Sequence, residues 1–275
     1  MSDSNRLRAL AEVVSVEGWH KAFEDGGARA DLHVDVVFGV GRIGGGDPSG
    51  VRFRLGLKRA QLVVVSPDHE PVRIDPASVR RDAPKPVLGK TEVKAKVSKS
   101  AGLSLTGQAG ASTKGLKAEA AGKAHVALAA SKNRTVVATQ AYKGMTVTQS
   151  RTAEGGYRWA IEPALGEGSL AGRPWDAEKS PMLALVDQRP RGSKSMPPTV
   201  RIEVRCLRED LEISQIKLED PQLWALLNRR KAARNRLIAA EAAIRTLLAE
   251  EGLVSGDMND AFAHLTLAVT VADAV

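Results

Sequence analysis

Apolar and polar residues alternate through residues 91–111, and this long alternation constrains the fold more than any other part of the sequence. The odd positions of the stretch are mostly apolar or glycine, whereas the even positions are charged, polar or glycine. After the turn sequence at 112–115, small and apolar residues occupy the even positions of 116–130. A period of two residues is typical of a β-strand, and a change of parity across a turn is typical of a hairpin. The pattern therefore predicts a long amphipathic β-hairpin within residues 87–141.

The arms of this hairpin would each run for about twenty residues, whereas ordinary strands have about five or six. If Ala111 faces Leu116 across the turn, Leu103 faces Ala124 on the same side of the ribbon. We call that side the small-residue face, and we expect it to make the assembly or membrane contacts of the protein. Its principal positions are Val97, Ala101, Leu103, Leu105, Ala109, Leu116, Ala124, Val126 and Leu128.

Three interpretations of this segment remain open. In the first, the hairpin lies over the rest of the protein or joins neighbouring subunits in a shared sheet. In the second, it enters a membrane as in β-barrel pore formers, where closure of the barrel satisfies the backbone groups in lipid. In the third, the second arm is a helix, because residues 118–130 contain seven alanines and Glu119 and Lys123 have helical ion-pair spacing. Gly122 and the continued alternation count against the helix.

The length of the small-residue face agrees with the membrane interpretation, but its composition does not. A barrel strand crosses the hydrocarbon with about nine to eleven residues. Lys99 and Lys132 interrupt the face on the two arms, so 101–111 and 116–130 are just long enough to span. The face is nevertheless rich in Ala and Gly, and no Trp or Tyr occurs within residues 87–140 to form an aromatic girdle.

Shorter alternating runs on both sides of this segment predict further strands. Residues 31–40 and 51–58 are expected to pair as an antiparallel hairpin across the glycine-rich residues 41–50. Additional strands are predicted at 61–65, 145–150, 157–161, 182–186, 199–207 and 211–218. Short strands between Gly- and Pro-rich turns favour an antiparallel sandwich over a βαβ array.

Helical spacing is confined to the two ends of the chain. Leu7, Leu10, Ala11 and Val14 predict a short amphipathic helix over residues 5–23. Near the other end, an Asp-Pro pair at 220–221 is a helix start, and a glycine at 252 is a helix stop.

The predicted class is α+β and β-rich, an antiparallel β-sandwich with a long amphipathic β-hairpin insertion and a long C-terminal helix. The expected divisions are a helical N-terminal segment (1–29), the sandwich domain (30–219) with its hairpin (87–141), and a C-terminal part (220–275) with the long helix (221–251) and a terminal strand.

The charge balance favours acidic partners. Lys and Arg number 40 against 32 Asp and Glu, a formal net charge of +8. Anionic membrane lipid and nucleic acid are both attracted by such a surplus, although no aromatic residues are interleaved with the basic ones for base stacking. The predicted basic surface consists of Arg80, Arg81, Lys94, Lys96, Arg229, Arg230, Lys231 and Arg234.

Motifs for catalysis are weak. Gly39–Gly44 matches GxGxxG, but Gly45-Gly46-Asp47-Pro48 follows where a helix should begin, which favours a glycine-rich loop. His33 lies between Asp31 and Asp35 on one strand, either on a solvated face or beside a cation. Cys206 is the only cysteine, so we expect a buried, inert thiol. No catalytic residue, cofactor or metal site is expected.

We expect a non-enzymatic, self-assembling protein whose hairpin mediates homo-oligomerisation, with membrane insertion as a β-barrel pore former as the most specific form of that activity. The alternative is a basic nucleic-acid-binding accessory protein, and a hydrolase comes third. No stretch approaches eighteen consecutive apolar residues, and the first residues lack the pattern of a secretory signal. The expected location is therefore cytoplasmic, with membrane association after assembly.

Overall fold

The computed structural model describes residues 6–7, 9–24, 26–45, 50–67, 69–81, 144–164, 166, 168–193, 195–218 and 232–275. All of them belong to one compact unit, Met1–Val87 with Lys143–Val275. The predicted hairpin at 87–141 lies outside the described residues, as do residues 221–231 of the predicted long helix.

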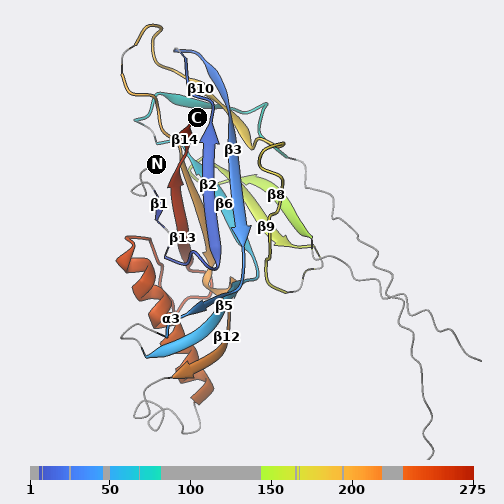
Figure 1. Ribbon diagram of the computed structural model, residues 1–275, viewed down its shortest axis with the longest axis vertical. Helices are drawn as coiled ribbons and strands as arrows, with labels where there is room; N and C mark the ends of the chain where they lie inside the picture. Colours follow the sequence, from blue (N-terminus) through green and yellow to red (C-terminus); the bar gives the residue numbers. More distant parts are fainter. Residues whose placement is uncertain are drawn as a thin grey trace, which may run out of the picture. The chain divides into compact units, whose positions relative to one another are not determined.

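The described residues form a β-rich body with three sheets and one α-helix (Figure 1). The six-stranded sheet has the order β1-β13-β11-β6-β9-β8, with β1 Arg6–Leu7, β13 His264–Val271, β11 Arg201–Leu207, β6 Ala60–Val65, β9 Tyr157–Pro163 and β8 Met145–Arg151. The five-stranded sheet has the order β14-β2-β3-β10-β7, with β14 Asp273–Ala274, β2 Val14–His20, β3 Arg29–Phe38, β10 Leu183–Asp187 and β7 Val72–Asp75. The three-stranded sheet has the order β12-β5-β4, with β12 Leu211–Leu218, β5 Val51–Leu57 and β4 Gly41–Ile43.

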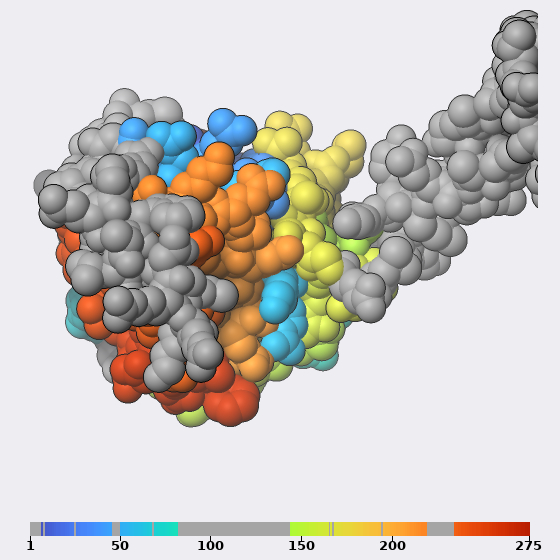
Figure 2. Space-filling view, turned by 90° about the horizontal axis from the view of Figure 1, so that it is seen from below, coloured from blue at the N-terminus to red at the C-terminus, as the bar shows by residue number. Residues whose placement is uncertain are grey.

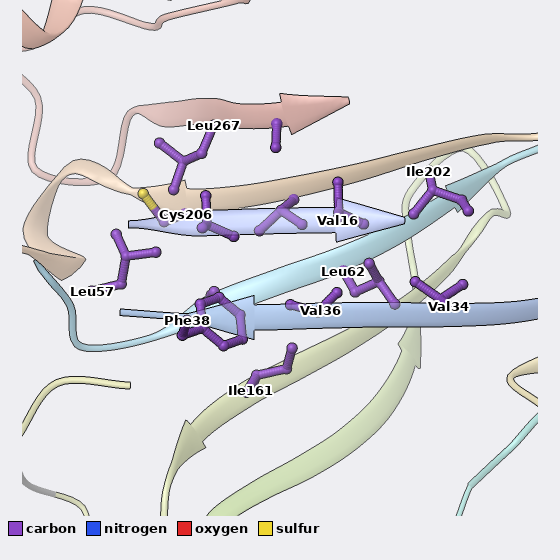
Figure 3. Close-up of a cluster of buried hydrophobic side chains, with 14 of the residues drawn as sticks. Val16, Val34, Val36, Phe38, Leu57, Leu62, Ile161, Ile202, Cys206 and Leu267 are labelled. Atoms are coloured by element: carbon purple, nitrogen blue, oxygen red, sulfur yellow. The ribbon is translucent and has the colours of Figure 1, made fainter. Parts of the chain in front are cut away.

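The core lies between the six-stranded and five-stranded sheets. Alternate side chains of β2 and β3, among them Val16, Val34 and Val36, are buried against residues of β6, β9 and β11 (Figure 3). The sheets approach closely at Gly18, where an added Cβ would collide with the Ile202 side chain. This face-to-face burial of alternate residues is the arrangement of a β-sandwich.

Helix α3 (Ala232–Glu250) packs on the three-stranded sheet. Ala240, Ile244 and Leu248 of the helix are fully buried, and Arg208 forms an ion pair of 2.5 Å with Glu241. Figure 2 looks at this end of the molecule, with the orange residues of the β11–β12 region beside the red-orange C-terminal residues. Gly252 has a φ of +69° just after α3 ends at Glu250, the left-handed conformation that glycine adopts readily at a helix end.

The predicted N-terminal helix at 5–23 is wrong. Residues 9–13 form a turn in which the amides of Val13 and Val14 both donate to the Leu10 carbonyl, and β2 follows directly. The apolar spacing fitted a helix, but the β-branched valines at 13, 14 and 16 favour a strand, and alternate β2 residues face the core.

The predicted pairing of 31–40 with 51–58 is also wrong, although both segments are strands. Strand β3 pairs with β2 from Val14↔Phe38 to His20↔Leu32, whereas β5 belongs to the three-stranded sheet. The neighbours of β5 are β12 and the short β4, and β4 lies in the segment predicted as a turn. The alternation of a strand shows its buried face but not which strand lies beside it.

The remaining predicted strands are confirmed as β6, β8, β9, β10, β11 and β12, with ends within two residues of those expected. The predicted terminal strand is present as β13, followed by the two-residue β14. None of the helices within the described ranges has the length and apolar character needed to cross a membrane.

Candidate functional site

The principal positions of the small-residue face lie outside the described residues, as do Lys94, Lys96, Arg229, Arg230 and Lys231 of the predicted basic surface. What the structure describes is where the chain leaves the sandwich before this segment and where it returns. Arg81 is the last described residue before the segment, and Gly144 is the first after it. We refer to the residues that hold these two points as the hairpin base.

Each end of the undescribed segment follows or precedes an edge strand. The chain leaves through β7, the last strand of the five-stranded sheet, and returns through β8, the last strand of the six-stranded sheet (Figure 1). Within the described residues, β7 pairs only with β10 and β8 only with β9. The segment therefore connects the edges of the two sheets that enclose the core.

Arg80 fixes the exit point through its backbone and its side chain. Its amide donates to the Met182 carbonyl at 2.8 Å, and its own carbonyl accepts from the indole Nε1 of Trp159 at 2.9 Å. Its guanidinium carbon lies 5.8 Å from the ring centroid of Trp175, within cation–π range. Trp159 is 1% exposed and comes from the middle of β9, so the exit is tied to the core of the opposite sheet.

A strap at residues 172–182 connects the exit to β3. Phe38 and Gly172 exchange two backbone hydrogen bonds of 3.0 and 2.9 Å, and the Met182 amide donates to the Leu32 carbonyl at 2.8 Å. Between them, the indole Nε1 of Trp175 donates to the Val34 carbonyl at 2.6 Å. The bonds at Val34 and Phe38 lie on the stretch of β3 beyond its pairing with β10. The bond at Val34 holds the Trp175 ring against the Arg80 guanidinium.

The return point is held separately. The Ala164 amide donates to the Gly144 carbonyl at 2.8 Å, and Met145 opposite Pro163 starts the pairing of β8 with β9. Trp159 of β9 and Ala164 just after it, which hold the two points, are five residues apart, or about 17 Å at the rise of a strand. This separation is wider than the spacing of about 4.8 Å between neighbouring strands of a hairpin.

The side chains of His33 and Asp35 in the Asp31–His33–Asp35 group both contact other parts of the protein. The ring Nδ1 of His33 donates to the Ala177 carbonyl at 2.7 Å, in the tautomer that carries its proton there, and the ring stacks on Trp19 at 5.6 Å. Asp35 is held by Nε of Arg173 at 2.9 Å, and this contact raises the pKa of the Arg173 guanidinium. His33 and Asp35 therefore both bind the strap. No cluster of three or more His, Cys, Asp or Glu side chains suited to a metal ion occurs among the residues the structure describes.

The described members of the predicted basic surface lie on different elements. Arg80 belongs to the hairpin base, Arg81 donates to the Pro76 carbonyl at 3.3 Å, and Arg234 is exposed on α3. The GxGxxG sequence runs from the end of β3 into β4, so its glycines do not begin a helix.

A different set of basic residues lines a cavity of about 690 Å³. Arg73 of β7 and Arg201 and Arg205 of β11 contribute to its wall, together with the β8–β9 turn at residues 152–156. Sequence reasoning missed this group because its members are far apart in the chain. The available signal was the alternation of β11, which places Arg201, Glu203 and Arg205 on the face opposite Ile202, Val204 and Cys206.

Cys206 is 1% exposed in the core, and burial raises the pKa of its thiol well above the ordinary value. Because the thiolate is the reactive form, we expect native protein to resist maleimide at pH 8, and we expect rapid labelling after denaturation. Mass spectrometry of the labelled protein measures both states. Stoichiometric labelling of the native protein within minutes would contradict the buried position of β11.

No protein-family model, no curated protein and no solved structure matches this chain.

Proposed function

We propose that this protein is a non-enzymatic, self-assembling protein whose segment 87–141 mediates homo-oligomerisation, with insertion into anionic membranes as the most specific form of that activity. The observation that carries the proposal is the length of the alternating pattern in that segment, together with the strands to which the two ends of the segment are connected. Both of its ends join edge strands of the body, and the strands on either side of it supply a continuous core among the described residues.

The edge strands support assembly because each has a strand neighbour on one side only among the described residues. On the side away from β9, β8 has no strand neighbour among the described residues, and it directly follows the segment. An edge of this kind accepts a strand from another chain unless something covers it. Hairpin arms continuous with β8 would let neighbouring subunits build a shared sheet from this edge.

The hydrogen bonds of the hairpin base support the proposal, because they would keep the sandwich folded while the segment changes its contacts. The exit is held by the Trp159–Arg80 hydrogen bond and the return by the Ala164–Gly144 hydrogen bond, and both bonds belong to the body. A segment mounted in this way can exchange partners without unfolding the sheets. An enclosed barrel formed by several subunits would satisfy its backbone groups in lipid.

Substitutions on the two faces of the predicted hairpin test the proposal. We expect Leu103→Asp to leave the thermal unfolding of the soluble protein unchanged and to abolish oligomers and dye release on anionic liposomes. A charged residue on the lipid face of a barrel is destabilising, by about 2–4 kcal/mol for Arg or Lys at the midplane and by less for Asp, and this cost is repeated in every subunit. The matched control is Ser104→Lys, which places a charge on the opposite parity and should keep both activities.

The outcomes separate the interpretations of the segment. Dye release by wild type and by Ser104→Lys, lost in Leu103→Asp, supports insertion. Oligomers without dye release support a shared sheet that stays outside the membrane. Wild type that neither assembles nor releases dye, or a Leu103→Asp protein that assembles normally, contradicts the proposal. A steep loss of affinity for nucleic acid between low and moderate salt would support the nucleic-acid alternative instead.

A further inference from the structure

Two of the arginines that line the cavity are held by a buried carboxylate, that of Glu203. The Glu203 side chain is only 6% exposed although it lies on the outward face of β11. Its Oε1 lies 2.7 Å from Nη2 of Arg201, and its Oε2 lies 2.7 Å from Nε and 2.6 Å from Nη2 of Arg205. One carboxylate therefore holds two guanidiniums in fixed positions along the cavity wall.

The two guanidiniums keep unused hydrogen-bond donors. Each arginine has five N–H donors, and Glu203 lies against one nitrogen of Arg201 and two of Arg205. The side chains of Arg201 and Arg205 are 50% and 32% exposed, so their remaining donors are accessible. Pre-positioned guanidiniums match the oxygens of an oxyanion and lose little entropy on binding it.

Arg73 adds a third guanidinium from another strand. It is exposed on β7, lines the same cavity, and forms no ion pair with any of the described side chains. The acid in the wall is Glu154, whose pKa is lowered mainly by a hydrogen bond with its own backbone and one with Thr152, with a contribution from Arg205. Arg73, Arg201 and Arg205 against Glu154 and Glu203 leave a charge of +1, since three positive and two negative groups are present.

The opposite rim of the cavity is a closed turn. The Thr152 amide donates to the Gly156 carbonyl at 2.9 Å, and the Gly156 amide donates to the Thr152 hydroxyl at 3.0 Å. The Thr152 and Gly156 amides already have partners, so the arginines are the charged donors that the lining offers to a ligand. A volume of about 690 Å³ is within the range of small-molecule sites, about 300–1,000 Å³.

We propose that this cavity binds a phosphate group, carried either by a soluble phosphoester or by a lipid headgroup. The Glu203 carboxylate already engages two of the guanidiniums from one side, and a phosphate has enough oxygens and charge to accept from the remaining donors of all three. The residues that bind it are Arg73, Arg201 and Arg205, and Glu203 is a positioning residue. This inference does not depend on the proposed assembly, because the cavity belongs to the sandwich itself.

The test is the thermal stability and calorimetric titration of the full chain with inorganic phosphate, at constant ionic strength set by chloride. We expect phosphate to raise the unfolding temperature of wild type. Arg73→Gln should weaken binding about tenfold, the equivalent of about 1.4 kcal/mol for one lost charge-assisted contact. Arg73 is exposed and forms no ion pair with any described side chain, so this variant should fold normally. Arg201→Gln should weaken binding in the same way, while Arg205 still holds Glu203.

The matched control is Arg54→Gln, which removes the same charge from an exposed position on β5 outside the cavity. Flotation with phosphatidylcholine vesicles, with and without phosphatidylglycerol, separates the two sources of the phosphate. Binding of inorganic phosphate identifies a soluble ligand, whereas binding to the anionic vesicles alone identifies a lipid headgroup. In either case the binding must be reduced by Arg73→Gln and not by Arg54→Gln. Equal losses of binding in Arg73→Gln and Arg54→Gln would overturn the proposal, because diffuse attraction to any polyanion, including DNA, has that result. The absence of binding both to inorganic phosphate and to the vesicles would also overturn it.

Discussion

A chain in which residues 87–141 are replaced by about six Gly and Ser residues is expected to fold and to lose all assembly. The reason is that the core of the sandwich comes from strands outside the segment. Trp159 and Ala164, which hold the exit and the return, are five residues apart, or about 17 Å at the rise of a strand. The remaining residues 82–86 and 142–143 with such a linker have a root-mean-square span of about 20 Å, which covers that distance without strain.

Circular dichroism and thermal unfolding measure whether the body folds, and light scattering with anionic liposomes measures assembly. The matched control is a chain in which residues 87–141 keep their composition but have a shuffled order, so that the alternation is lost. Both variants should unfold at the wild-type temperature and remain monomeric. If the chain without the segment still forms oligomers, the assembly surface lies on the sandwich. If that chain does not fold, the segment is part of the core.

Trp159→Ala is expected to cause the largest loss of stability of any single substitution considered for this body. Trp159 is among the largest fully buried side chains, and its truncation costs about 3–5 kcal/mol. The Arg80 carbonyl also loses its indole donor, at a cost of about 1 kcal/mol. At about 2–4 °C per kcal/mol for a domain of this size, the unfolding temperature should fall by about 10 °C or more.

Trp159→Phe separates packing from the hydrogen bond. The phenyl ring retains most of the apolar contacts but has no N–H for the Arg80 carbonyl, so we expect a smaller fall in the unfolding temperature than in Trp159→Ala. Hydrogen exchange should also become faster at the residues next to Arg80. An unfolding temperature for Trp159→Ala within about 2 °C of wild type would contradict the position of this side chain in the hairpin base.

Alternation predicted the strands because one face of each strand is buried in the sandwich. β11 is the clearest example, with Ile202, Val204 and Cys206 in the core and three charged residues on the other face. The four-residue β7 was not predicted, since it is too short to show a period and lies between Pro71 and Pro76. For β2, helical and strand spacing both fitted the apolar positions, and packing against the six-stranded sheet selected the strand.

The sites depend on contacts that no local pattern contains. The parity of β9 places Trp159 toward the core, but its bond to Arg80 arises from the packing of β9 on a distant part of the chain. Arg73 and Arg201 are similarly brought to one cavity by the connection of β6 to β7 and by the pairing of β6 with β11. Sequence reasoning identified neither group, because strand partners are set by tertiary structure.

The mass of the purified full chain, measured with and without anionic liposomes, tests the central claim most directly. If segment 87–141 mediates assembly, the protein forms discrete species of several subunits on the liposomes, or already in solution, and the chain lacking that segment is monomeric in both conditions. A full chain that remains monomeric in solution and on liposomes of every composition and pH tested would contradict the account.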